Sequence, residues 1–406
     1  MHVVFVEPHF PANQREFVRA LHQIGVRVTG IGESPFSSFD EDLRRWLYHY
    51  EQVPSVVNEE AVVKTVRWIQ ERMPVDRIEA TVEAHILSTA RVREACGIAG
   101  TSLQTAWLCR DKPTMKEVLR QADIPCAQST GTASMDEARA FAEQVGYPLI
   151  LKPRSGAGAS GTYKVDNPEE FEQALVASGL SRGANIAIEE FIDGHEGFYD
   201  TIAVDGEPVH EFVTHYYPNV LEAMRTRWIS PQFITTNRID AQGYDEVKEM
   251  GRRVIAALGI GSSATHMEWF YGSKGLKFSE IGCRPPGVRA WDLYGAANEM
   301  DLYVEWALAV CFGKRSQAAS RRFAAGIVTL RPDRDGRIAR YEGLEAIQRA
   351  FGEWIVDYHL PPVGHGTQPV EAGYMANAWV RMRHPDYDEL RRMLDAVGET
   401  VKVRAE

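Results

Sequence analysis

The sequence has few of the features that mark secreted, membrane-spanning or zinc-binding proteins. It contains five cysteines, and none of them forms a C-x-x-C pair or another spacing typical of a zinc site. No apolar run approaches the ~18 residues that suggest a membrane helix. The first ten residues, MHVVFVEPHF, lack the basic and apolar segments of a secretory signal. We therefore expect reduced thiols, a cytoplasmic location and no membrane partner.

Positive charge is also scarce. The 406 residues include 45 Lys and Arg against 56 Asp and Glu, which gives a formal net charge of −11. We expect no nucleic-acid partner, because non-specific binding to nucleic acids depends on positive charge. Hydrophobic residues make up 44% and charged residues 25% of the chain, which is the usual balance of a globular protein. The length allows two or three domains with separate cores.

The apolar pattern at the start of the chain indicates alternating strands and helices. Residues 2–7 and 26–32 are short apolar runs, and residues 14–25 between them have helical spacing. The alternation continues in residues 78–98, so residues 1–110 are predicted to form a doubly wound parallel α/β domain. The turn after the first strand contains no glycine, which makes it unsuitable for a dinucleotide pyrophosphate.

The rest of the chain is predicted to mix helices with antiparallel hairpins, an α+β arrangement. We find no internal repeat and no low-complexity linker. Helices are expected near residues 113–124, 134–146, 167–178 and 246–260, and hairpins at residues 198–214 and 263–282.

A glycine-rich stretch, LILKPRSGAGASGTYKV, occupies residues 149–165. Gly156, Gly158 and Gly161 spell G-x-G-x-x-G, a pattern shared by dinucleotide-binding folds and kinases. A dinucleotide site needs the glycines to lead into a helix, whereas here they lead into the β-type segment TYKV. Lys152 precedes the glycines, which excludes a Walker A loop, and the H-R-D and D-F-G motifs of kinases do not occur. The stretch indicates a flap over phosphates or a plain surface hairpin, and a nicotinamide oxidoreductase stays open as an alternative.

A second cluster lies in HMEWFYGSKGLKFSEIGCRPPG, residues 266–287. Glu268 and Glu280 are expected on two strands joined by the turn at residues 272–275, so a tight hairpin would bring both carboxylates to one face. Two neighbouring carboxylates repel each other unless a cation lies between them, and Mg²⁺ prefers one or two carboxylates together with substrate phosphates. The alternative is that both glutamates face solvent. Arg284, between a cysteine and two prolines, favours a metal–phosphate site, because a fixed cation stabilises a transferred phosphoryl or acyl group.

Four separated motifs together resemble the ATP-grasp superfamily. They are RDK at residues 110–112, YPLILKP with its glycine loop, IEEFIDGHE at residues 188–196, and HMEW with SEIGCRPPG. Over roughly residues 75–300 the chain is similar to the carboxylate–amine ligase branch, which includes L-amino-acid ligases and proteins related to biotin carboxylase. The resemblance implies an ATP-grasp fold with an N-terminal α/β domain (1–110), a lid subdomain with the glycine flap (111–188), a catalytic subdomain with a larger mixed sheet (189–312) and a C-terminal α/β subdomain (313–406).

The resemblance also implies roles in phosphate binding and catalysis. Lys112 and Lys152 would reach the phosphates of ATP, although Lys112 alone would fit a solvated helix start. Lys152 and Arg284 would be the catalytic cations. Glu268 and Glu280 would bind one or two Mg²⁺ ions, with Mn²⁺ as a substitute. The flap residues expected to cradle the phosphates are Ser155, Gly156, Gly158, Ser160 and Gly161.

The segment IEEFIDGHE would bind the nucleoside. By resemblance, Glu189 would accept from the adenine amino group, and the backbone of Glu190 and Ile192 would contact the adenine edge. Glu196 would hold the ribose hydroxyls. The alternative for this segment is an ordinary strand end with exposed acidic residues.

The sequence says less about the substrates. Many members of the superfamily have Asn two residues after the second metal glutamate, and Gly282 occupies that place here. Arg289 could clamp a substrate carboxylate, and Arg227 lies in the loop MRTRWIS. His9 and Asn13 lie at the carboxyl end of the first strand, where α/β sheets bind ligands. Ordinary loop polarity is the alternative for the three loop residues.

The function implied by the resemblance is an ATP-dependent ligase. It would join a small carboxylic acid, such as an amino acid, to an amine through an acyl phosphate, with ADP and phosphate as products. Its partners would be these two small molecules, and we expect a homodimer. An ATP-binding protein without catalysis and an ATP-grasp carboxylase are the alternatives, although no biotinyl M-K-M motif occurs in this chain.

Overall fold

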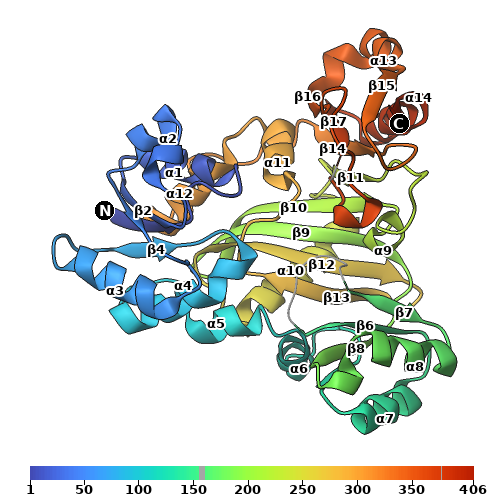
Figure 1. Cartoon of the computed structure of the whole chain (residues 1–406), viewed down its shortest axis with the longest axis horizontal. Coiled ribbons are helices and arrows are strands. Elements are labelled where there is room, and N and C mark those ends of the chain that lie inside the picture. The colour runs from blue at the N-terminus through green and yellow to red at the C-terminus, as the bar shows by residue number, and fades with distance from the viewer. Residues whose placement is uncertain (155–160, 376) are drawn as a thin grey trace.

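The computed structural model describes residues 1–154, 161–375 and 377–406. It is a mixed α/β structure, which confirms the predicted fold class. An N-terminal α/β unit lies at one end of a long central sheet, and a small second sheet lies below the other end (Figure 1). No helix of these described residues combines the length and the apolar character needed to cross a membrane.

The N-terminal unit contains the predicted parallel sheet. Its four strands lie in the order β3-β2-β1-β4, and each neighbouring pair is parallel. Strand β1 is buried at all five positions, as expected for a strand covered on both faces. The elements are β1 (His2–Val6), α1 (Gln14–Gln23), β2 (Arg27–Gly32), α2 (Glu41–Trp46), β3 (His49–Gln52), α3 (Glu59–Gln70), β4 (Arg77–Glu79), α4 (Glu83–Cys96) and α5 (Leu103–Leu108).

The next segment forms a small lid with its own sheet. Strand order is β5-β8-β6-β7, and β6 pairs with β7 in the antiparallel direction. Asp111 caps the first lid helix by accepting from the backbone N–H of Thr114, which makes Lys112 the first residue of that helix. The elements are α6 (Lys112–Gln121), β5 (Ser129–Thr132), α7 (Met135–Val145), β6 (Leu149–Pro153), β7 (Tyr163–Val165), α8 (Pro168–Ala177) and β8 (Ile186–Glu190).

The central sheet has eight strands in the order β13-β12-β9-β10-β11-β14-β17-β16. The predicted turn at Asp205 and Gly206 is confirmed, since both residues have the positive φ of a type I′ hairpin turn (49° and 89°). The elements are β9 (His195–Val204), β10 (Glu207–Tyr217), α9 (Val220–Ala223), β11 (Gln232–Thr235), α10 (Asp245–Ala257), β12 (Ser263–Gly272), β13 (Gly275–Gly282), α11 (Ala290–Asn298) and α12 (Leu302–Phe312).

The C-terminal segment extends this same sheet. Strands β14, β17 and β16 continue it beyond β11, so the boundary expected at residue 312 falls within one sheet and not between two. A two-stranded sheet, β15 with β18, lies beside helices α13 and α14. The elements are β14 (Ala324–Leu330), β15 (Ile338–Glu342), α13 (Leu344–Phe351), β16 (Ile355–His359), β17 (Ala378–His384), α14 (Tyr387–Thr400) and β18 (Lys402–Ala405).

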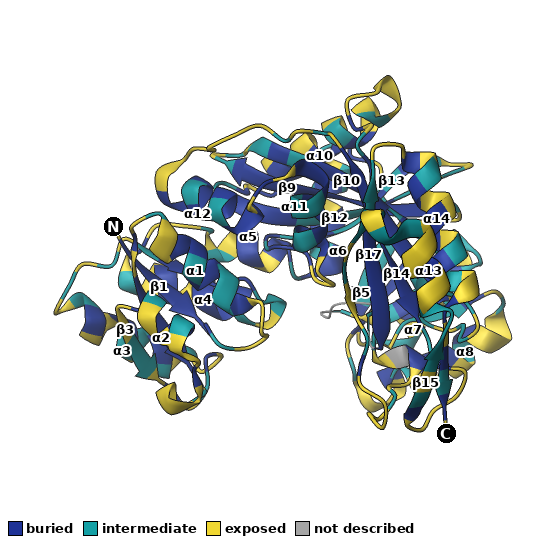
Figure 2. Cartoon of the chain, turned by 90° about the horizontal axis from the view of Figure 1, so that it is seen from above, coloured by how far each residue is buried: buried dark blue, intermediate teal, exposed yellow. Residues whose placement is uncertain are grey.

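Aromatic packing joins the N-terminal unit to the central sheet. Phe17 of α1 contacts Trp291 of α11 and Trp306 of α12 at ring-centroid distances of 5.3 and 5.0 Å. All three residues belong to one buried cluster, which also includes Phe198 of β9. The inner strands of the central sheet, such as β9 and β14, are largely buried, whereas exposed residues lie on the outer faces of helices such as α13 (Figure 2). The relative position of the N-terminal unit is therefore fixed by a shared core.

The lid meets the central sheet at one edge. The backbone N–H of Phe278 in β13 donates to the carbonyl of Pro125 (2.8 Å), and Cys126 forms a single parallel β-bridge with Phe278. The lid sheet and strands β12 and β13 therefore face each other, and the space between them contains the candidate site.

Candidate active site

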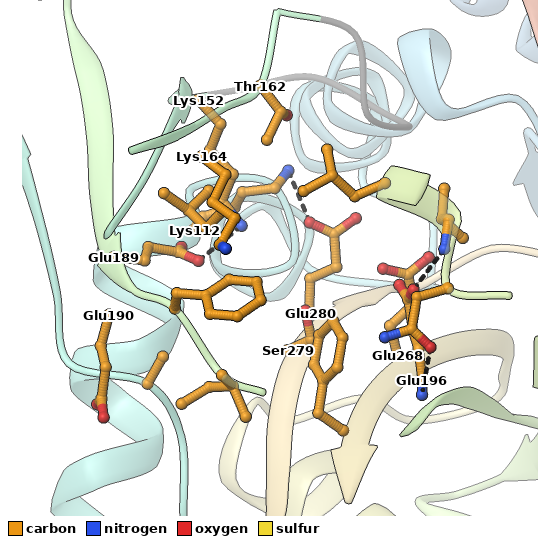
Figure 3. Close-up of a pocket in the computed structure, with 18 of the residues that line it drawn as sticks. Lys112, Lys152, Thr162, Lys164, Glu189, Glu190, Glu196, Glu268, Ser279 and Glu280 are labelled. Carbon is orange, nitrogen blue, oxygen red and sulfur yellow. Dashed lines mark hydrogen bonds and ion pairs between the residues drawn. The ribbon is translucent and has the colours of Figure 1, made fainter. Parts of the chain in front are cut away.

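A cavity of about 470 Å³ opens between the lid and the central sheet. Lysines reach it from the lid side, and carboxylates reach it from β9, β12 and β13 (Figure 3). Its apolar wall consists of Ala127, Ile150, Pro153, Phe191, Ile192, Val220, Leu221, Phe270 and Phe278.

Strand register explains why the carboxylates meet. Glu268 lies directly opposite Glu280 in the β12–β13 pair, which confirms the hairpin predicted from the sequence. Neighbouring β9 places Glu196 opposite Phe270, two residues from Glu268. Because side chains alternate between the faces of a sheet, Glu196, Glu268 and Glu280 all project from the same face into the cavity.

A buried network of two lysines and one carboxylate forms the lid wall. Oε2 of Glu189 lies 2.7 Å from Nζ of Lys116 and 2.8 Å from Nζ of Lys152. Burial raises the pKa of Glu189, but the two ammonium groups outweigh it and lower that pKa to about 2. Lys116 was not predicted, although its spacing of four residues from Lys112 puts both side chains on one face of α6.

Some of the atoms expected to contact adenine already form hydrogen bonds or ion pairs within the protein. Both lysines occupy Oε2 of Glu189, while its buried Oε1 has no hydrogen-bond partner among the described residues. The N–H of Glu190 donates to the carbonyl of Gln128 (2.9 Å), and its carboxylate pairs with Lys274. Glu190 lies away from the carboxylates of Glu268 and Glu280 (Figure 3). Ile192 lines the cavity, and its N–H forms no hydrogen bond within the described part of the chain. An unpaired acceptor and an unpaired donor beside an apolar slot fit a planar base such as adenine.

Glu196, Glu268 and Glu280 form one wall of the cavity, which we call the carboxylate wall. This wall fits a hard cation that is also bound to phosphates. Lys112 Nζ lies 3.1 Å from Oε2 of Glu280, and Lys112 and Lys152 lower the pKa of Glu280 against the effect of burial. Burial and the nearby Glu268 raise the pKa of Glu196 to about 8, and its Oε2 accepts from the N–H of Val220 (2.6 Å). Within residues 1–154, 161–375 and 377–406, no group of three His, Cys, Asp or Glu side chains forms a complete metal site. Mg²⁺ suits such a wall, because it takes few protein ligands and completes its shell with phosphates and water.

The role of Glu196 at the ribose stays a prediction, and its location in the cavity also allows a second role. Its charged neighbours are Glu268, Glu280 and Lys152, which are the groups of the carboxylate wall. Figure 3 shows it beside Glu268, away from Glu189 and Glu190. This position favours a role near the cation.

The glycine loop falls largely outside the described residues, which end at Arg154 and resume at Gly161. Ser155, Gly156, Gly158 and Ser160 are therefore named from the sequence alone. Gly161 has a φ of 69°, which favours glycine. The strand after the loop, β7, pairs with β6 in the antiparallel direction. The oxidoreductase alternative is wrong, because it required a helix directly after the glycines.

Arg284 lies beside a second, smaller cavity that adjoins the carboxylate wall. Glu83, Arg110, Lys112, Glu280 and Arg284 all line it. Arg284 and Arg110 both bind the carboxylate of Glu83, which belongs to the N-terminal unit. Glu83 and Arg110 were not predicted as site residues, because their positions depend on contacts between distant parts of the chain.

A buried chain of polar residues also reaches the carboxylate wall. Asp200 of β9 accepts from the hydroxyl of Tyr294 and from Nδ1 of His266 (2.7 Å). Nε2 of His266 lies 3.7 Å from Oε1 of Glu268. Burial lowers the pKa of His266, but Asp200 and Glu268 outweigh it and raise that pKa to about 9. The sequence contains a signal for this residue, since the spacing of His266 and Glu268 puts both on one face of β12.

The four residues suggested for substrate binding lie elsewhere. Arg289 pairs with Asp292 (3.4 Å) and lies over the ring of Trp379, and Arg227 pairs with Asp335 (2.7 Å). His9 stacks on Phe39, and Asn13 is exposed at the start of α1. None of the four lines either of the two cavities described above. From the same MRTRWIS loop, the structure instead brings Arg225 to the larger cavity.

Comparisons with known proteins agree with this geometry. Residues 111–213 match the family described as the ATP-binding domain of the carbamoyl-phosphate synthase L chain. An L-arginine-specific L-amino acid ligase of Bacillus subtilis is 30% identical over 220 residues, which are 53% of this chain and 52% of that protein. An alanine–anticapsin ligase of Bacillus subtilis (strain 168) is 25% identical over 281 residues, which are 63% of this chain and 58% of that protein. The match thus spans little more than half the length of these relatives.

One solved structure shows the same fold over nearly the full length of both chains. It is an L-amino acid ligase from Bacillus licheniformis, with a TM-score of 0.76 and 18% identity, and the match covers 100% of this chain and 98% of that one. The ATP-binding domain match and the shared fold agree with the arrangement of lysines and carboxylates around the cavity. Residues 111–213 therefore resemble an ATP-binding domain, and the whole chain has the fold of this L-amino acid ligase.

Proposed function

We propose that the protein is an ATP-dependent carboxylate–amine ligase that forms an amide bond through an acyl phosphate. The observation that supports this most directly is the meeting of lysines and carboxylates in one cavity. Lys112 and Lys152 approach from the lid, and Glu196, Glu268 and Glu280 approach from the sheet. Such an arrangement neutralises terminal phosphates and allows a phosphoryl group to be transferred.

In this proposal the nucleotide is a substrate held between the two walls. Its adenine occupies the apolar slot, with Oε1 of Glu189 and the N–H of Ile192 as partners. Lys112 and Lys152 contact the phosphates. Lys116 keeps Glu189 in place from below.

Glu268 and Glu280 would hold Mg²⁺, and Glu196 is a further candidate ligand. Mg²⁺ bound there would offset the negative charge of the phosphates during transfer. Gly282 offers no side-chain ligand, so the carboxylates, phosphates and water would complete the coordination. The pairing of Lys112 with Glu280 keeps that carboxylate ionised and ready for a cation.

The chemistry then follows in two steps. A carboxylate oxygen of the first substrate attacks the γ-phosphorus of ATP, the bond to the bridging oxygen breaks, and ADP leaves. The amine of the second substrate attacks the carbonyl carbon of the acyl phosphate, and phosphate leaves with the C–O electrons after the amine loses a proton. Arg284 and Lys152 stabilise the negative charge on the transferred group. The lid excludes water, which would otherwise hydrolyse the acyl phosphate.

The names of two relatives suggest that at least one substrate is an amino acid. One relative is described as specific for L-arginine and the other joins alanine to anticapsin. The test is incubation with ATP, Mg²⁺ and pairs of amino acids, with ADP, AMP and phosphate quantified and products identified by mass spectrometry. ADP and phosphate in equal amounts, dependent on both substrates, are expected.

Other outcomes would contradict the proposal in distinct ways. Stoichiometric AMP would mean that attack occurs at the α-phosphate. ADP release that depends on bicarbonate and no amine would point to a carboxylase. Tight nucleotide binding without turnover across the whole panel would favour a binding protein. The cytoplasmic location and the homodimer stay predictions.

A further inference from the structure

A single carboxylate of the N-terminal unit joins two arginines beside the catalytic cavity. Glu83 is the first residue of α4, and its Oε2 accepts from Nε of Arg284 (2.5 Å) while its Oε1 accepts from NH1 of Arg110 (2.7 Å). Arg284 follows the metal-binding hairpin, and Arg110 lies two residues before Lys112. One side chain thus links the two segments that carry Lys112 and Glu280.

These contacts fix the direction of the Arg284 guanidinium. Nε is bound to Glu83, and NH1 donates to the carbonyl of Pro285 (2.8 Å). The third nitrogen, NH2, has no hydrogen-bond partner among the described residues and is not among the fully buried polar atoms. Arg284 lines the small cavity together with Lys112 and Glu280. NH2 is therefore the nitrogen left to contact an anionic group of the reaction.

Gly282 provides the space for this pair. A Cβ atom at residue 282 would lie 3.4 Å from Oε2 of Glu83 and 3.4 Å from Cγ of Arg284, which is ordinary van der Waals contact. Alanine would therefore fit, whereas a longer side chain would need the volume that the ion pair occupies. Glycine at residue 282 therefore leaves room for the ion pair between Glu83 and Arg284.

The charges around Glu83 favour a rigid arrangement. Burial raises the pKa of Glu83, but Arg284 and Arg110 outweigh it, so that the carboxylate is ionised. Only 21% of the Glu83 side chain and 16% of the Arg284 side chain are exposed, which limits screening by water. Each carboxylate oxygen serves one arginine, and a shared, charge-assisted contact of this kind restricts both guanidinium groups.

We propose that Glu83 is a positioning residue for catalysis, which holds Arg284 across the domain interface so that NH2 faces the transferred phosphoryl group. This inference rests on the ligase function proposed above. It assigns a catalytic purpose to the N-terminal unit, whose carboxylate orients a cation that the central sheet supplies. The transferred group contacts NH2 of Arg284. Glu83 acts through Arg284 and does not itself contact the reacting atoms.

The test compares Glu83→Gln with Glu59→Gln as a matched control. Glu59 is likewise the first residue of a helix in the N-terminal unit and pairs with an arginine, Arg91 (2.9 Å), but lies away from both cavities. Glu83→Gln should lower kcat about 10- to 100-fold, since a misplaced catalytic group costs up to about 10²-fold. The KM for ATP and the Kd for ADP should stay within about two-fold, because the nucleotide site keeps its own lysines. Glu59→Gln should match the wild type in all three quantities.

A second pair of variants, at Gly282 of β13, tests the same contact between Glu83 and Arg284. Gly282→Leu should reproduce the fall in kcat with retained ADP binding, and Gly282→Ala should remain close to the wild type. These variants keep the inference testable even if Glu83→Gln unfolds. Guanidinium ion should stimulate Arg284→Ala, and this rescue should disappear in the double variant with Glu83→Gln. A merely structural role for Glu83 would instead lower the melting temperature and ADP affinity together and leave the rescue intact.

The outcomes separate this inference from the proposed function. A wild-type protein that releases no ADP with any substrate pair overturns both. Wild-type turnover with an unchanged kcat in Glu83→Gln, or equal rescue by guanidinium with and without Glu83, overturns the positioning role alone. Turnover in the wild type with the selective loss of kcat described above supports both.

Discussion

Replacing Glu189 by Gln should destabilise the lid far more than replacing its partner Lys116 by Met. Among the residues that the structure describes, Glu189 is the one carboxylate that contacts both Lys116 and Lys152, and its side chain is only 6% exposed. Glu189→Gln leaves two buried ammonium groups without that counter-charge. Lys116→Met removes one of the two cations, keeps a similar volume, and leaves the Glu189–Lys152 pair intact.

The expected losses in the free energy of unfolding follow from the charges that each variant leaves unpaired. Breaking a buried ion pair from one side costs about 3–5 kcal/mol, and a volume-conserving apolar replacement costs less than about 1.5 kcal/mol. The two ammonium groups also lower the pKa of Glu189 from its ordinary value of 4.5 to about 2, which has the same sign: the ionised carboxylate is stabilised in the folded protein.

Hydrogen exchange followed by mass spectrometry is a suitable assay, because it reports the local stability of β6 and β8. Exchange of these strands should be roughly 10²- to 10³-fold faster in Glu189→Gln and only slightly faster in Lys116→Met. Since the folded-state pKa is lowered, the stabilisation is present above pH 4.5 and is lost as the pH falls towards 2. The difference in exchange rate between the wild type and Glu189→Gln should therefore become smaller between pH 5 and pH 3. Equal exchange in the two variants, or a gap that does not change with pH, would refute the reasoning.

Two further variants test the carboxylate wall. Glu280→Ala should lower ADP release by at least about 10²-fold with an unchanged circular dichroism spectrum, because its proposed role is to balance the charge of a cation. Turnover equal to that of the wild type would place the metal site elsewhere. Asp200→Asn should lower the free energy of unfolding in urea by about 1–3 kcal/mol, because the buried Asp200 accepts from His266 and Tyr294. The control Asp205→Asn, in an exposed turn, should stay within about 0.5 kcal/mol, and an equal effect of the two changes would show that the buried network contributes nothing.

Local sequence signals were sufficient for the hairpin that carries Glu268 and Glu280. The turn at residues 272–275 fixes the strand register, and that register puts Glu268 opposite Glu280. The same is true of the antiparallel pair around the glycine loop, because TYKV has the composition of a strand and the helix begins only at Pro168. In both places the deciding residues lie within about 20 positions of one another, so chain connectivity alone restricts the geometry.

The sequence could not specify contacts that depend on how the units pack. Glu83 and Arg284 are 201 residues apart, and their contact depends on a core that α4 shares with β13, in which Ile86 and Ile281 both take part. Glu189 was expected to bind adenine through its carboxylate, but the burial of Lys116 engages one of its oxygens. The charged residues considered for the substrate, such as Arg289, had no positional signal beyond their charge, and a nearby carboxylate pairs with them instead.

The attachment of the lid has a consequence for self-association. The central sheet ends at β13 and at β16, and an unpaired edge strand offers a template for another chain. At β13 the segment at Pro125 and Cys126 already occupies part of that edge, so the segment that follows the lid helix α6 also blocks strand addition there. At β16 the edge is short, five residues, and exposes Tyr358. The protection of this sheet edge and the attachment of the lid beside the cavity thus depend on the same stretch of polypeptide.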